Sequence, residues 1–289
     1  MKRYVLAVTA ALALTSFGFA QQQPAQQQQQ GAAAQQAGPK VKSQKELDAL
    51  KKVQGAATPQ ERLDAIDGVL ENFTDTEYKH ILLDMAIQTA QQLREPAKVE
   101  TYAERALKDD PKDATAQLAI ASSTLQGTKE FDLDKEQKLT KAEKYANNAL
   151  ESLKTEAPPN PQLTEAQWQE AKKQMSAEAY ANLGAAAALR KKYDVALTNY
   201  KTAADQDPDP VILVRLANAY NEAKQPENAI ATADRILAMN DAPAPVKQIA
   251  QQEKAKAEKA KSGESTTGTA NPAAPKPSTP TPATPAPAK

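Results

Sequence analysis

The chain has 289 residues, in which 36 basic residues balance 36 acidic residues, and it contains no cysteine. A balanced charge gives no general affinity for nucleic acid or for an anionic membrane surface. The lack of cysteine excludes disulfides, thiolate metal sites, a cysteine nucleophile and a lipid-modified N-terminal cysteine. Aromatic residues make up only 4% of the chain and alanine dominates its apolar fraction, a composition that favours closely packed helices over sheets.

Residues 1–20 have the pattern of a secretory signal peptide. They begin with Lys2 and Arg3, continue with an apolar run and end in the small residue Ala20, after which we expect cleavage. The apolar run is too short for a typical transmembrane helix, so we expect no stable membrane insertion after cleavage; a retained anchor is the alternative. The sequence therefore predicts an exported protein, periplasmic or secreted.

Both ends of the mature chain have compositions that do not support a packed core. Residues 21–40 are rich in glutamine and alanine, and residues 262–289 are rich in proline, threonine and alanine. We predict disorder in both, because neither can bury enough apolar surface to offset the entropy lost on ordering. A glutamine-rich interaction segment remains the alternative for the first. For the tail, a wall-threading spacer, a ligand for another domain and a solubilising tail remain open.

The stretch from residue 177 to 208 has the periodicity of two short helices that fold back on each other. One stripe of the first helix carries Tyr180, Leu183, Gly184 and Ala187, and the second helix carries Ala196, Tyr200 and Ala203 at i, i+4 and i+7. Pro208 ends the unit, because proline lacks the N–H that would continue a helix. Glycine inside a helix costs about 1 kcal/mol relative to alanine, so Gly184 indicates a close crossing of the two helices.

These residues resemble the tetratricopeptide-repeat (TPR) signature, which is aromatic-x2-Leu-Gly-x2-Tyr, then Ala-x3-Phe, then Pro, in about 34 residues. Tyr180-x2-Leu183-Gly184 matches the first part, with Ala187 in place of the usual tyrosine, and Ala196-x3-Tyr200 matches the second. The resemblance extends roughly over residues 77–240. It implies an all-α fold, a right-handed α-solenoid of TPR-like helical hairpins that acts as a scaffold.

The same spacing recurs along a predicted repeat domain of residues 41–261. We expect helix pairs at about 43–73, 77–111, 114–153, 164–208 and 210–240, followed by a polar capping helix at 245–261. Matching triads fall on the second helices: Val99, Ala103 and Ala106; Ala142, Ala146 and Ala149; Ala229, Ala233 and Ile236. Ser43, Thr58, Thr74 and Thr164 are the expected N-terminal caps of four helices.

An insertion near residues 127–135 separates the two helices of the third pair. It is charged except for Phe131 and Leu133, which we expect to pack onto the neighbouring helix. Insertions at a turn of a helical repeat lie on one edge of the array and can be functional, which is the alternative.

Apolar residues also mark the long fourth pair and the capping helix. Trp168, the only tryptophan, lies on an extension that precedes the Tyr180 helix. We expect it to pack against Pro158, Pro161 or the previous repeat, with exposure for a ligand as the alternative. In the capping helix we expect Val246 and Ile249 to face inward.

The sequence contains no motif that indicates catalysis or cofactor binding. It has no glycine-rich phosphate loop, no dinucleotide-binding fingerprint and no metal-spaced histidine pair. His80 is the only histidine, and we expect it to serve packing or to lie at the surface. The carboxylates are scattered on polar helix faces, and no spacing selects a facing pair of the kind that glycoside hydrolysis needs. We therefore predict no enzyme, no cofactor and no metal site.

In TPR-like arrays the first helices of the pairs line a concave groove, and this resemblance gives the candidate partner-binding residues. A helical-wheel projection places nine polar residues there: Asp84, Gln88, Gln91, Ser122, Gln126, Asn182, Arg215, Asn218 and Asn221. Most of these side chains are neutral hydrogen-bonding groups, which suit a peptide backbone or a partner helix better than a phosphate.

The chaperone-type members of the family hold a C-terminal carboxylate with a clamp of Lys, Asn and Arg. Asn182 and Arg215 align with the Asn and Arg of such a clamp. Leu118 and Val211 stand where the lysines of the clamp would be. The alternative is that Asn182 and Arg215 are ordinary polar surface residues.

Taken together, the sequence predicts a non-catalytic scaffold or adaptor for protein–protein interaction in the bacterial periplasm or cell envelope. It would bind a peptide or partner helix of unknown identity, and no nucleic acid. Two alternatives remain: a structural envelope protein that self-associates or bridges to the cell wall through its tails, and an accessory subunit of a secreted enzyme complex.

Overall fold

The structure is a computed structural model that describes residues 39–158 and 163–263. Within those residues it contains eleven α-helices and no strand. The helices are α1 (Gln44–Gly55), α2 (Pro59–Asn72), α3 (Lys79–Leu93), α4 (Pro96–Asp109), α5 (Ala114–Gln126), α6 (Lys135–Thr155), α7 (Glu165–Leu189), α8 (Tyr193–Gln206), α9 (Pro210–Glu222), α10 (Pro226–Ala238) and α11 (Ala244–Lys261). The predicted signal peptide and nearly all of the glutamine-rich segment and the proline-rich tail lie outside the described residues. No helix in the described part is long and apolar enough to cross a membrane.

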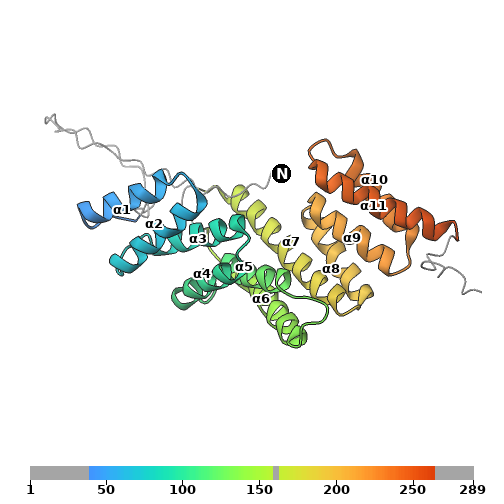
Figure 1. Ribbon diagram of the computed structural model, residues 1–289, viewed down its shortest axis with the longest axis horizontal. Coiled ribbons are helices and arrows are strands. Elements are labelled where there is room, and N and C mark those ends of the chain that lie inside the picture. Colours follow the sequence, from blue (N-terminus) through green and yellow to red (C-terminus); the bar gives the residue numbers. More distant parts are fainter. Residues whose placement is uncertain (1–38, 159–162, 264–289) are drawn as a thin grey trace, which may run out of the picture.

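The helices stack as hairpins into an elongated array, with α1 and α11 at opposite ends (Figure 1). Each helix contacts the next one along the chain, and contacts of α3 with α5, α5 with α7, α7 with α9 and α9 with α11 place the first helices of successive hairpins side by side. The predicted all-α repeat fold is therefore confirmed.

The predicted triads on the second helices form the centre of the packing. All twelve residues of the four triads, in α4, α6, α8 and α10, are at most 4% exposed. Nine of the twelve are alanines, so the helix axes can approach closely along each hairpin. The larger apolar residues gather in two clusters, one spanning Leu50 to Ile120 and the other Ala177 to Ala257. Two smaller clusters rich in alanine join them through α5, α6 and α7.

Three of the four predicted helix caps are present. Ser43, Thr58 and Thr164 accept hydrogen bonds from backbone amides in the first turns of α1, α2 and α7. The prediction for Thr74 is wrong, because α3 begins later, at Lys79, and has no side-chain cap.

A neighbouring threonine explains this later start. Thr76 donates its hydroxyl to the buried carboxylate of Glu46 at 2.6 Å and accepts the amide of Tyr78. The loop before α3 is thereby held to α1, and a helix cannot begin at Thr74.

Three of the hairpins turn through a residue with a left-handed backbone. Arg94, Lys191 and Lys224 have φ of 58°, 61° and 57° and follow α3, α7 and α9. In each case the next amide bonds back to a carbonyl five residues earlier, on Ala90, Ala187 and Tyr220 respectively, which satisfies the free carbonyls at the end of the helix.

The insertion in the third hairpin carries its apolar residues outward. Phe131 is 93% exposed and Leu133 is fully exposed, so the expectation that they pack onto a helix is wrong. The reason lies in the neighbouring charges: Glu130 pairs with Lys135 and Lys191, and Asp132 accepts Lys138 at 2.9 Å. These ion pairs tie the acidic residues to the array and leave the two apolar side chains at the tip.

The close crossing predicted at Gly184 is present between α7 and α8. A Cβ atom added to Gly184 would lie 2.8 Å from two ring carbons of Tyr200, and Tyr200 is itself buried. Real Cβ atoms do not approach an aromatic ring so closely, so the ring requires glycine at this position.

Replacing Gly184 with alanine should lower the free energy of unfolding by about 1–3 kcal/mol, because the ring must move out of a packed site. The matched control is Gly68→Ala in α2, where an added Cβ meets no atom within 4 Å. That change should raise stability by about 0.5–1 kcal/mol through helix propensity. Urea unfolding of both variants checks this, and equal effects would rule out the crossing.

Candidate functional site on the inner face of the C-terminal hairpins

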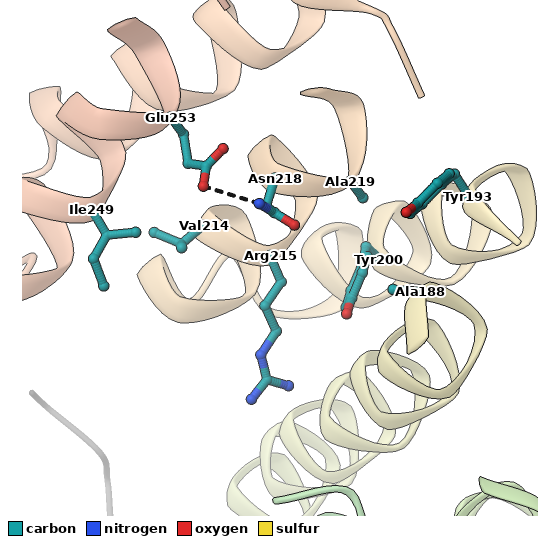
Figure 2. A pocket seen from close by; sticks show the side chains of 9 residues that line it. All are labelled: Ala188, Tyr193, Tyr200, Val214, Arg215, Asn218, Ala219, Ile249 and Glu253. Carbon is teal, nitrogen blue, oxygen red and sulfur yellow. Dashed lines mark hydrogen bonds between the residues drawn. The ribbon is translucent and has the colours of Figure 1, made fainter. Parts of the chain in front are cut away.

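A cavity of about 280 Å³ lies among α7, α8, α9 and α11 (Figure 2). Its lining residues are Ala188, Tyr193, Tyr200, Val214, Arg215, Asn218, Ala219, Ile249 and Glu253. Most of the wall is apolar or aromatic, with one cation and one carboxylate. The cavity is open to solvent on one side, so a peptide or side chain could reach its apolar walls and its few polar groups.

The carboxylate of Glu253 is occupied by two amides of α9. The side-chain amide of Asn218 donates to Oε1 at 3.0 Å, and that of Asn221 donates to Oε2 at 2.8 Å. Asn221 also donates to the backbone carbonyl of Glu253 at 2.9 Å. These bonds fix α11 against α9 and form one wall of the cavity.

Arg215 is the cationic group of the cavity. It is exposed, and Figure 2 shows its guanidinium extending from α9 on the side of the cavity to which the hydroxyl of Tyr200 also points. Burial of the Tyr200 ring raises its pKa to about 12, so Tyr200 is a neutral hydroxyl at physiological pH. The pair therefore presents a positive charge beside a hydroxyl group.

The structure separates the nine predicted partner-binding residues. Arg215 and Asn218 line the main cavity, whereas Asp84 and Gln88 line a much smaller pocket on α3. Gln91 and Gln126 are exposed and Ser122 is half-buried, and none of these three lines either pocket. Their role in binding a partner stays a prediction.

Two of the nine residues bind the same carboxylate on α11, and another of the nine is buried. Asn221 and Asn218 bind Glu253, as described above. Asn182 is only 4% exposed, and its amide nitrogen is buried with no hydrogen-bond partner among the described residues. Leu118, which stands where the clamp would have a lysine, is also buried. Asn182 and Arg215 therefore do not form the exposed carboxylate clamp of the chaperone-type members.

Wheel projection missed Tyr193, Ile249 and Glu253 as cavity residues. Ile249 is 43% exposed, which corrects the expectation that it faces inward. Helix α11 buries Ala250 and Ala257 instead. Its contact face is therefore rotated by about one residue from the expected face, and Ile249 lines the cavity.

A second group of polar residues lies in the N-terminal half, where α3 meets the start of α5. His80 and Asp84 lie one turn apart on α3, and Asp113 is the N-cap of α5. Burial raises the pKa of Asp84 to about 7 and raises that of Asp113. Burial, reinforced by the charge of Asp113, likewise raises the pKa of Glu156 to about 7. The sequence pattern had suggested only a packing or surface role for His80.

The raised pKa of Glu156 predicts a pH dependence of stability. The folded chain binds the proton more tightly than the unfolded chain, so stability falls as pH rises from about 4.5 to about 7. Glu156→Gln should therefore stabilise the protein by ~1 kcal/mol at pH 8, since the side chain is only half-buried. The difference should vanish near pH 4.5.

Thermal unfolding across this pH range measures the effect. Glu151→Gln is the matched control, because Glu151 is an exposed carboxylate on α6, the helix that Glu156 caps. A constant difference between Glu156→Gln and the wild type at all pH values would contradict the assignment.

No protein-family model and no curated protein sequence matches the chain. Among solved structures, a thermophilic TPR protein from Thermus thermophilus is similar at 14% identity with a TM-score of 0.51, covering 72% of this chain and 98% of that one. A tetratricopeptide repeat protein from Parabacteroides merdae is similar at 16% identity with a TM-score of 0.38, covering 76% of this chain and 93% of that one. The chain has a TPR fold.

Within this TPR array, α7 is longer than the other helices, with 25 residues. Its N-terminal extension carries Trp168, which is buried and donates its indole N–H to the backbone carbonyl of Glu156 at 3.2 Å. Lys172 lies over the indole ring at 5.2 Å. The predicted packing of Trp168 onto the previous repeat is confirmed, and the extension holds the third and fourth TPR hairpins together.

Proposed function

We propose that this TPR protein is a non-catalytic scaffold that holds an extended peptide or a partner helix on the inner face of its C-terminal hairpins. The observation that carries the proposal is the cavity among α7, α8, α9 and α11, which is lined by four separate helices. A peptide segment placed there would touch all four helices at once, as expected for a scaffold that reads a short segment of its partner.

The chemistry of the lining indicates which segment would fit. Val214 and Ile249 offer an apolar surface, and Arg215 offers a planar set of donors that matches a carboxylate. Glu253 keeps its negative charge, but its two oxygens accept the amides of Asn218 and Asn221 and are held against α9. The preferred ligand is therefore an apolar side chain adjacent to an acidic group, either an acidic side chain or a free C-terminus.

The same lining argues against catalysis in the cavity. Its titratable side chains are Tyr193, Tyr200, Arg215 and Glu253. The one carboxylate accepts two amide hydrogen bonds, and Tyr200 is a neutral phenol. This set contains no activated nucleophile and no paired general acid and base.

A charge reversal tests the binding proposal. Arg215→Glu should weaken peptide capture by the full chain at least tenfold, or about 1.4 kcal/mol, because it replaces attraction to the acidic group with repulsion. Arg235→Glu is the matched control, since Arg235 is exposed on the outer helix α10. The probe is a displayed library of short peptides with free or amidated C-termini, and binding is measured by fluorescence polarisation of the selected sequences.

The outcome also separates the alternatives. Capture that survives Arg215→Glu but is lost when residues 264–289 are removed would place binding in the tail, as in the cell-wall bridging alternative. A doubled mass in light scattering would favour self-association. If peptide capture is unchanged both in Arg215→Glu and after removal of residues 264–289, the cavity is not the binding site.

We also propose that the scaffold acts outside the cytoplasm, in the periplasm or cell envelope, on the strength of the basic start, apolar run and small-residue end within residues 1–20. Expression of the full chain in a bacterium should yield an envelope protein whose N-terminal residue is Gln21. Edman or mass-spectrometric sequencing of the mature protein checks this. An intact Met1 in the cytoplasmic fraction would contradict export, and an intact Met1 in the membrane fraction would indicate a retained anchor.

A further inference from the structure

His80, Asp84 and Asp113 form a compact group of metal-ligand side chains between α3 and α5. The Nε2 atom of His80 lies 3.5 Å from Oδ2 of Asp84, and its Nδ1 atom lies 3.8 Å from Oδ2 of Asp113. One ligand atom from each residue lies within 4.8 Å of those of the other two. The two carboxylates face opposite nitrogens of the ring, so a single ion among the three side chains would use one of these nitrogens after the half-exposed imidazole turns.

Asp113 provides an independent observation that points to a ligand at this position. Its side chain is 2% exposed, and one oxygen, Oδ1, caps α5 by accepting the amide of Ala116 at 3.0 Å. The other oxygen, Oδ2, is buried without a hydrogen-bond partner among the described residues and lies toward His80. A buried carboxylate oxygen without a partner is costly, and a metal ligated at that oxygen removes the cost.

The surrounding charges strengthen this argument. Oδ1 of Asp84 and Oε2 of Glu156 are also buried without a hydrogen-bond partner in the described part of the chain. The positive end of the α5 dipole offsets only about half a charge, and His80 can contribute at most one. In their ionised forms, the three carboxylates around this helix start therefore carry more negative charge than the helix dipole and His80 can offset.

We propose that His80, Asp84 and Asp113 bind a divalent transition-metal ion of the Zn²⁺ class, which links α3 to α5. One imidazole nitrogen and two carboxylate oxygens are a typical ligand set for such an ion, at about 2.0–2.2 Å, with water in the remaining position. Mg²⁺ is a poor match, because it prefers an all-oxygen octahedron. The i, i+4 spacing of His80 and Asp84 places both ligands on one face of α3.

This site is separate from the cavity proposed for peptide binding. It joins the second and third hairpins, whereas the cavity lies among α7, α8, α9 and α11. An ion at this position would cross-link two neighbouring hairpins and stabilise the N-terminal half of the array. The two proposals therefore fail or stand independently.

The test uses the full chain without a polyhistidine tag, stripped with EDTA and dialysed. Titration calorimetry with Zn²⁺ should give one site per chain, and the melting temperature should rise with Zn²⁺ concentration because only the folded chain has the site. Because His80 is the only histidine, a ¹H–¹⁵N spectrum of its imidazole reports directly which nitrogen binds the metal. Mg²⁺ at the same concentration should leave this spectrum unchanged.

Variants assign the ligands. His80→Gln and Asp84→Asn should each weaken Zn²⁺ binding at least tenfold. Asp113→Asn should do the same while keeping an oxygen that caps α5, so a loss there is not a loss of the helix start. Asp109→Asn is the matched control, because Asp109 is an exposed carboxylate at the end of α4.

Several results would overturn the proposal. If Zn²⁺ leaves the His80 resonances of the wild type unchanged, the proposal is wrong. This measurement does not depend on whether any variant folds. Affinity equal in His80→Gln and the wild type would show that the metal binds elsewhere. Equal binding of Mg²⁺ would reject a transition-metal site.

Discussion

The array depends on helices that approach one another mainly across alanine side chains. An alanine buries little apolar surface, and the stabilisation from burial is about 25 cal/mol per Å². Close contact must therefore recur in every hairpin, and the buried triads of α4, α6, α8 and α10 provide it. Between α7 and α8 the approach requires a glycine, because the Tyr200 ring occupies the space of a missing Cβ at Gly184. At this crossing the large Tyr200 ring fills the space beside Gly184, which two alanines would leave partly empty.

Features that depend on one helix could be predicted from the sequence. The triads follow from helical periodicity, and the caps at Ser43, Thr58 and Thr164 are contacts with the first turn of their own helix. Thr74 failed because the neighbouring Thr76 bonds to Glu46, which lies 30 residues earlier. Sequence spacing carries no information about such a partner, and it is the tertiary contact that decides where α3 begins.

The candidate site was predictable only in part, for the same reason. A helical wheel identifies the face on which Asn218 and Asn221 lie, but it does not show that Glu253 of a later helix will bind both amides. The wheel also placed Asn182 in the groove, whereas packing buries it. His80 and Asp113 belong to different hairpins, so their proximity arises only when α3 and α5 pack side by side. For Glu253 and for Asp113, the polar partner comes from a helix that the wheel does not include.

Helix α7 connects the two halves of the molecule and fixes how they are oriented. At its start the Trp168 indole bonds to the carbonyl of Glu156, and just beyond its end the Arg190 guanidinium pairs with Glu136 at 2.7 Å and with Glu143. Its middle packs into one of the small alanine-rich clusters, and its last turn packs into the other. Directional polar contacts at the two ends resist rotation, which alanine packing alone would permit. The cavity, with Ala188 of α7 in its wall, is thereby held in a fixed position relative to the N-terminal hairpins.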